Sequence, residues 1–172
     1  LNVPMLFSLS IDCLLYVTDY LDGRNVFLLW SCGDSRLQQK LQGVKTLHFS
    51  AKRGPWTSFL LSRFGGLQNL VWKPQVFSAD ASLLEQLVSG LPTTLKVFKV
   101  NSRYARVSTL YTLLPRLPQV ETLKISMNLP EPYQLSPLLR DIRLGTAPRQ
   151  FQEFLDSVPL AESIKFAEGN YD

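Results

Sequence analysis

The chain has 172 residues, of which 45% are hydrophobic and 19% are charged, and its formal net charge is +4. This apolar content, in a chain of this length, predicts a folded protein with a sizeable core and excludes a disordered, highly charged chain. No run of 18 apolar residues occurs, so the sequence predicts no membrane-spanning helix.

The first forty residues predict three short helices. Residues 9–22 carry apolar side chains at helical spacing, and a glycine follows them. Residues 26–30 form a second apolar segment, which Gly33 ends. Asp34 is placed to cap a third helix that runs to Leu41.

From residue 44 onward, one pattern occurs six times: apolar, two variable residues, apolar, one variable residue, apolar. The last two apolar residues of each copy share one face of a strand, because strand side chains alternate between faces. One copy cannot bury its apolar face alone, whereas stacked copies share a core and form a parallel sheet. The central residues, which we predict to point into that core, are Leu47, Leu70, Phe98, Leu123, Ile142 and Ile164.

The segments between the predicted strands have helical apolar spacing. Helices are predicted at residues 58–64, 82–88, 108–114 and 150–155, and each ends near a glycine or a proline. Residues 126–137 are rich in proline, and we expect them to be irregular. The sequence therefore predicts an α/β protein.

A repeat of roughly 20–29 residues with this core pattern resembles the leucine-rich repeat family. The resemblance implies a solenoid over residues 43–172, with a parallel sheet on its concave face and short helices on its convex face. The family usually has a turn-capping asparagine three residues past the third apolar position. Asn128 fits that position, but the other five repeats lack it. An ordinary α/β domain with short parallel strands is the alternative.

Three short helices ahead of such repeats resemble an F-box. The residues that carry this resemblance are Leu9, Asp12, Leu14, Leu15, Tyr20, Leu21 and Asp22, whereas Ser10 stands where the family has proline. The resemblance implies that residues 1–42 bind a Skp-type adaptor. The adaptor contacts would be Leu9, Leu14, Leu15, Tyr20 and Leu21. The alternative is an N-terminal cap, which would bury Leu9, Leu14 and Tyr20 against the first repeat.

The variable residue between the last two apolar positions points away from the core, so these side chains line the concave face about 4.8 Å apart. In chain order they are His48, Val71, Lys99, Lys124, Arg143 and Lys165. Four consecutive cations therefore stack, and Asp141 is the nearby acid. We interpret them as a face for an acidic peptide, a phosphorylated segment or a nucleic-acid backbone. A solvated surface without a ligand is the alternative.

The sequence predicts no enzyme, cofactor or metal site. Cys13 and Cys32 are the two cysteines and His48 is the one histidine, which is too few for a zinc site or a nucleophile–histidine arrangement with any specificity. We expect the two cysteines to pack as free thiols. Because cysteine-rich caps are missing, we also expect an intracellular protein, in the cytoplasm or the nucleus, with an organelle as the alternative.

Two function classes follow from these features, both of them protein-interaction roles. The F-box resemblance implies a substrate receptor of a cullin-RING ubiquitin ligase. The alternative is a non-ligase structural or assembly subunit of a larger complex, which contacts an acidic or nucleic-acid partner.

Overall fold

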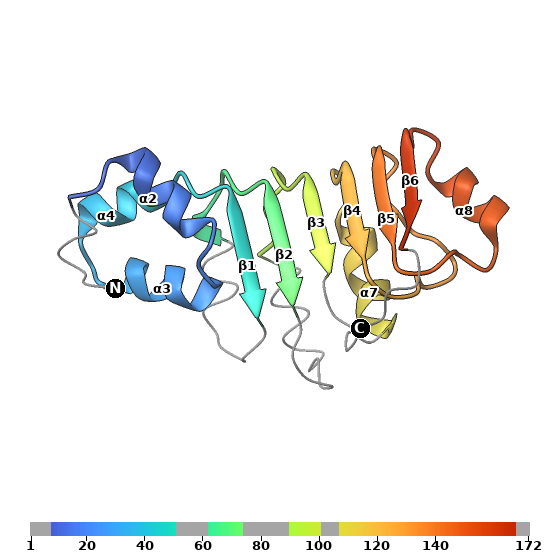
Figure 1. Cartoon of the computed structure of the whole chain (residues 1–172), viewed down its shortest axis with the longest axis horizontal. Coiled ribbons are helices and arrows are strands. Elements are labelled where there is room, and N and C mark those ends of the chain that lie inside the picture. The colour runs from blue at the N-terminus through green and yellow to red at the C-terminus, as the bar shows by residue number, and fades with distance from the viewer. Residues whose placement is uncertain (1–7, 51–61, 74–89, 101–106, 168–172) are drawn as a thin grey trace.

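The computed structural model describes residues 8–50, 62–73, 90–100 and 107–167. Its strands form one six-stranded sheet, and three helices lie at the N-terminal end (Figure 1). The strands are β1 (Thr46–Ser50), β2 (Asn69–Lys73), β3 (Val97–Val100), β4 (Thr122–Ile125), β5 (Asp141–Leu144) and β6 (Ser163–Phe166). The described helices are α2 (Ile11–Thr18), α3 (Gly23–Ser31), α4 (Ser35–Leu41), α7 (Val107–Leu113) and α8 (Phe151–Ser157), and a 3₁₀ helix, η1 (Leu114–Arg116), follows α7.

The sheet confirms the repeat register. Every neighbouring pair of strands is parallel, and the strands lie side by side in chain order. The central apolar residues of all six copies are aligned across the sheet, and the first five are at most 1% exposed. Ile164 packs against the core but is only half-buried, because β6 has one neighbouring strand in the described part of the chain.

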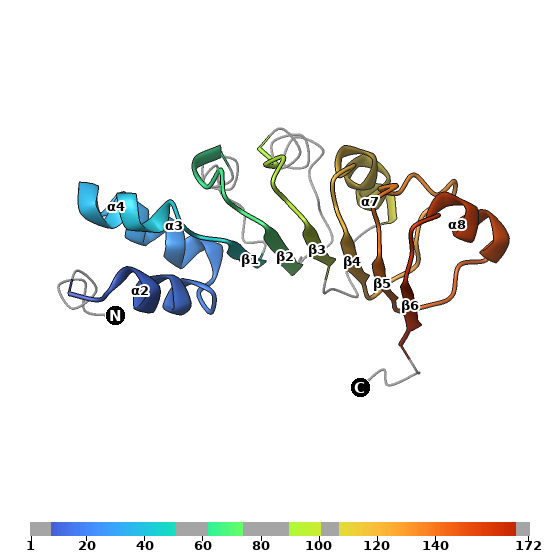
Figure 2. The ribbon, with the colours of Figure 1, turned by 90° about the horizontal axis from the view of Figure 1, so that it is seen from above.

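The convex side carries the helices expected between strands. Seen from above, α7 and α8 lie on the outer side of the curved sheet (Figure 2). They match the helices predicted at residues 108–114 and 150–155. The helix predicted at 82–88 lies outside the described residues, as does most of the helix predicted at 58–64. The overall arrangement is consistent with a leucine-rich-repeat-like fold.

The proline-rich segment at residues 126–137 is irregular, as expected. Within the described residues, the side chain of Asn128 forms no hydrogen bond with a backbone group; it is exposed, and its oxygen accepts a hydrogen bond from the Thr146 hydroxyl. The turn at this repeat therefore departs from the pattern implied by the family resemblance.

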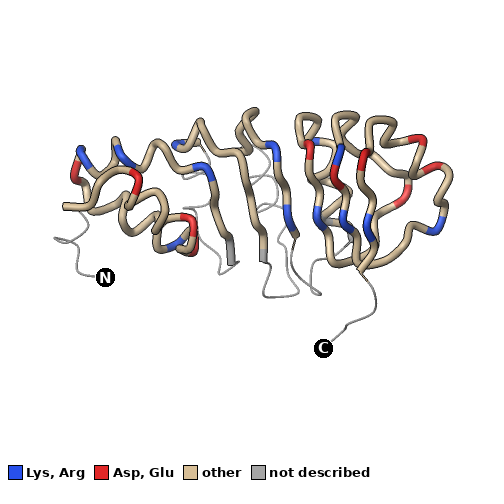
Figure 3. Tube along the Cα trace, turned by 45° about the horizontal axis from the view of Figure 1, so that its top comes forward, with Lys and Arg blue, Asp and Glu red and all other residues tan. Residues whose placement is uncertain are grey.

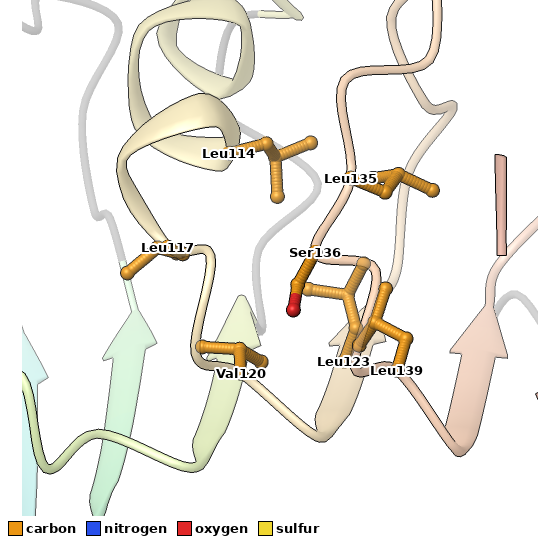
Figure 4. Close-up of a pocket in the computed structure, with 7 residues that line it drawn as sticks. All are labelled: Leu114, Leu117, Val120, Leu123, Leu135, Ser136 and Leu139. Carbon is orange, nitrogen blue, oxygen red and sulfur yellow. The ribbon is translucent and has the colours of Figure 1, made fainter. Parts of the chain in front are cut away.

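Beneath this segment, leucine side chains close the core. Figure 4 shows Leu135 and Leu139 on one side of a small gap and Leu114 and Leu117 on the other. The cavity that they line has a volume of about 10 Å³, which is about the space of one water molecule. Ser136 is buried there, and its hydroxyl donates a 2.7 Å hydrogen bond to the carbonyl of Pro118. The cavity is a packing gap and too small for a ligand.

Aspartates and a serine begin the N-terminal helices. Asp34 accepts a 2.9 Å hydrogen bond from the backbone N–H of Leu37, as the sequence predicts for the cap of α4. Asp22 caps α3 in the same way, and Gly23 is the first residue of α3 and is buried. The first predicted helix is also shorter than residues 9–22, because Asp19 forms the C-cap of α2.

The N-terminal helices and the repeats share one core. Leu14 of α2, Val26 of α3 and Leu41 of α4 are 0% exposed, and they belong to the same cluster as Leu47 and Leu70. The boundary predicted at residue 42 therefore does not separate two hydrophobic cores. It stays a prediction about domain organisation.

Gly145 follows β5 at a close backbone approach. Its N–H donates a 2.7 Å hydrogen bond to the carbonyl of Ile125, and a Cβ at this position would lie 2.5 Å from the carbonyl oxygen of Ser126. Because a backbone atom cannot give way as a flexible side chain does, Gly145→Ala is expected to lower the free energy of unfolding by about 1–3 kcal/mol. Urea unfolding measures the change. Gly65→Ala is the control, because no atom lies within 4 Å of its Cβ position; equal effects at both positions would contradict the expectation.

Candidate ligand-binding face

The parallel register aligns four cationic side chains on the open face of the sheet. Lys99 pairs with Lys124, Lys124 with Arg143, and Arg143 with Lys165, so the side chains form one row across β3–β6. We call Lys99, Lys124, Arg143 and Lys165 the cation row; Figure 3 shows it as a line of blue bands. Lys99 and Lys124 are half-buried, whereas Arg143 and Lys165 are exposed.

The other two members of this column behave differently. Val71 is only 7% exposed, so it offers little surface to a ligand although its position faces away from the core. His48 is half-buried, and its backbone forms an isolated parallel bridge with Asp22, which precedes α3. The cations of this column therefore begin at β3.

A second charged column lies just before the strands, and its charges alternate in sign. Lys96 and Glu121 form an ion pair at 3.0 Å, and Arg140 forms another with Glu162. We call these four residues the paired row; red and blue bands alternate along it in Figure 3. Sequence analysis missed these pairs, although reading one further position of the repeated pattern would have revealed the alternation.

The cation row lacks comparable neutralisation. Asp141 is aligned with Thr122 and Ser163 in the adjacent column, and its Oδ2 lies 3.5 Å from Nε of Arg143. Within the described residues, Lys99, Lys124 and Lys165 form no ion pair. One acid therefore faces four cations, and the row keeps an excess of positive charge.

The positive charges in the row act on one another. Burial lowers the pKa of Lys124 below its ordinary value, and the nearby charges of Lys99, Arg143 and Lys165 lower it further against the opposing effect of Asp141. Because folding lowers the pKa of Lys124, the charged form of this lysine is less stable in the folded protein than in the unfolded chain. The contribution of Lys124 to stability thus increases as pH rises through the lowered pKa. A bound anion would act in the opposite direction and favour the protonated form.

The five residues predicted to contact an adaptor do not form one exposed face. Leu14 is 0% exposed, while Leu9, Leu15 and Leu21 are partly buried against the core. Tyr20 is 73% exposed. Leu14 is therefore not accessible to a partner in this structure.

The solvent face of α2 and the turn after it combines one predicted contact, Tyr20, with residues that were not predicted. Ile11, Tyr16 and Tyr20 are exposed, and the two tyrosine rings pack edge to face with centroids 5.2 Å apart. The Tyr20 hydroxyl donates a hydrogen bond to that of Tyr16, which raises the pKa of Tyr20. This surface contains one of the five predicted contacts, Tyr20.

The described residues bear on two kinds of feature, a metal-binding group and a membrane-spanning helix. No group of three or more histidine, cysteine, aspartate or glutamate side chains in them is placed to hold a metal ion. No helix among them is both long enough and apolar enough to cross a membrane. Cys13 and Cys32 are free thiols, as expected, but both are exposed, so the prediction that they pack among apolar side chains was wrong.

Comparisons with known proteins add little to this description. No family model matches the chain, and no curated protein matches it. A solved structure of the leucine-rich repeat-containing protein LegL7 from Legionella pneumophila is similar at 14% sequence identity and a TM-score of 0.35, and the match covers 99% of this chain and 82% of that chain. A likeness this weak carries no argument about function, so the fold description rests on the strand register.

Proposed function

We propose that this chain is a protein-interaction module without enzymatic activity, and that it binds an anionic segment of a partner along its concave face. The cation row is the observation that carries the proposal. Four positive side chains occupy successive strands of one sheet, and within the described residues the acid that pairs with this row is Asp141. A partner that supplies negative charge would relieve the mutual repulsion of this row.

The paired row gives the internal comparison. Its residues stand on the same stack of repeats, yet Lys96 and Arg140 each have an acidic neighbour at the next repeat. Stacking therefore tolerates alternating charge, and uniform charge is not a requirement of the fold. Adjacent like charges about 5 Å apart in water cost on the order of 0.8 kcal/mol each before screening by salt. This cost is small, so a binding measurement is needed to test the proposal.

The test uses fluorescein-labelled poly-L-glutamate as a probe of anion binding. Lys99→Gln combined with Lys124→Gln is expected to weaken binding several-fold to about tenfold. Each of these two half-buried charges is expected to contribute up to about 1 kcal/mol to the binding free energy. Both lysines lack ion pairs in the described residues, so the substitutions leave no acid unpaired. Fluorescence anisotropy at two salt concentrations gives the affinities, and the loss should shrink at high salt.

A matched control removes the same charge elsewhere. Lys45 and Arg116 are exposed, lie outside the cation row and take part in none of the ion pairs of the described residues. Lys45→Gln combined with Arg116→Gln should leave the affinity nearly unchanged. If both double variants weaken binding equally, the probe responds to net charge alone and the proposal fails.

Of the two function classes, we propose the structural or assembly subunit rather than the ubiquitin ligase receptor. The burial of Leu14 in the shared core supports a capping role for the N-terminal helices, whereas Tyr20, which a cap was expected to bury, is 73% exposed. The ligase role needs a Skp-type adaptor on the remaining surface, where Ile11, Tyr16 and Tyr20 are exposed. Pull-down with a purified Skp-type adaptor tests it, and binding at micromolar concentration would favour the receptor.

A further inference from the structure

Small side chains flank the cation row on both sides over β4–β6. Thr122, Asp141 and Ser163 form the column on one side of it. The positions on the other side hold Ser126, Gly145 and Ala167. Long cationic side chains thus stand between two lines of short ones, and no bulky group in these columns prevents a rod-shaped ligand from lying across the strands.

The spacing of the row favours one ligand conformation. Neighbouring strands are about 4.8 Å apart, so the four cations span about 14 Å from first to last. An α-helix repeats the same face about every 5.4 Å, and three turns span about 16 Å. An extended peptide repeats one face about every 6.7 Å, and three such steps span about 20 Å. A helix with one carboxylate per cation therefore matches the length of the row more closely than an extended peptide does.

Asp141 adds a constraint on the ligand's charge pattern. Its Oδ2 lies near Arg143, whereas its Oδ1 is buried and has no hydrogen-bond partner in the described residues. A phosphodiester backbone carries negative charge at every repeat and would be repelled at this point. A peptide can place a donor side chain, such as an amide or an amine, beside its acidic residues, where it faces the exposed part of the Asp141 side chain, which is 29% accessible.

We propose that the partner segment is an acidic α-helix that lies across β3–β6, with carboxylates on successive turns facing Lys99, Lys124, Arg143 and Lys165 and a hydrogen-bond donor facing Asp141. This inference rests on the proposed function, because it names the partner of the same face. It excludes a nucleic-acid strand and an extended acidic peptide as the preferred ligands.

The test compares four labelled probes of equal net charge by fluorescence anisotropy against the whole chain. The first is a stapled helical peptide with glutamates at positions i, i+4, i+7 and i+11. The second has the same composition and staple, but its glutamates are distributed around the helix. The third is an unstapled peptide with glutamates at alternate positions, and the fourth is a thymidine oligonucleotide. Circular dichroism verifies that the first two probes are equally helical.

The first probe, called the one-faced helix because its glutamates share one face, is expected to bind at least about tenfold more tightly than each of the other three probes. Its affinity should be lower for the double variant Lys99→Gln and Lys124→Gln. Its affinity should be unchanged for the control double variant Lys45→Gln and Arg116→Gln. Asp141→Asn should raise the oligonucleotide affinity several-fold by removing a repelling charge, and so narrow the preference for the helix.

The outcomes separate this inference from the proposed function. If the alternate-glutamate peptide, the redistributed helix or the oligonucleotide binds as tightly as the one-faced helix, and the cation-row variant weakens that binding, the face binds anions but the helix assignment is overturned. If no probe distinguishes the cation-row variant from its control, the proposed function fails as well.

Discussion

Leu123→Ala is expected to lower the free energy of unfolding by about 2–5 kcal/mol, the range for deleting a leucine side chain from a closed core. Leu123 lies in β4 between Phe98 of β3 and Ile142 of β5, and its side chain is 1% exposed. The substitution leaves a cavity at a point where three repeats meet. Urea unfolding followed by circular dichroism measures the change, at a position central enough that neighbouring strands cannot readily close the gap.

Leu160→Ala is the matched control for this core substitution. Leu160 is 47% exposed in the turn before β6, so the same change of side chain should alter stability by no more than about 0.5 kcal/mol. Similar losses for the two leucines would mean that Leu123 does not occupy the tightly packed position described above.

The sheet could be predicted from sequence because its information is local and repeated. Each copy of the pattern fixes which side chains of one strand face the core, and the copies align as they stack. At the edge of the sheet, the burial of a side chain depends on whether a strand lies on each side of it, which the repeated pattern does not specify. Ile164 is therefore half-buried, although it occupies the same position of the repeat as Leu123.

The N-terminal helices were harder to place, since their ends depend on caps. In the sequence, Asp22 and Gly23 mark the end of the first predicted helix. In the structure they also begin the next one, because the Asp22 side chain accepts a hydrogen bond from the N–H of Arg24 and Gly23 is the first residue of α3. Apolar spacing identified Leu14 as part of a helix face. It could not decide whether that face meets a partner or the first repeat, because both surfaces are apolar.

The cation row was predictable from strand alternation, but its electrostatic setting was not. Val71 is buried although strand alternation places it on the open face, and the pKa of Lys124 is lowered by burial and by charges on neighbouring strands, which no single copy of the pattern contains. The pairing of Lys96 with Glu121 depends on register between strands. Register became certain only when all six strands were aligned.

Leu14→Ala is expected to lower the free energy of unfolding by about 2–5 kcal/mol if the N-terminal helices act as a cap. Leu14 is 0% exposed and shares its core with Leu41 and Leu47. Because solenoid repeats contact mainly their neighbours, the loss should be greatest at the N-terminal end. Hydrogen exchange should show reduced protection in α2–α4 and β1 and smaller changes in β5 and β6.

Tyr20→Ala separates a stabilising surface from a binding one. Tyr20 is 73% exposed, so its removal should change stability by no more than about 0.5 kcal/mol. If residues 1–42 bind a Skp-type adaptor, Tyr20→Ala should reduce adaptor capture while the fold persists. If they form a cap, neither the unsubstituted chain nor this variant captures the adaptor. Of the two substitutions, only Leu14→Ala then lowers the free energy of unfolding substantially. Adaptor capture that Tyr20→Ala abolishes would therefore contradict the cap assignment.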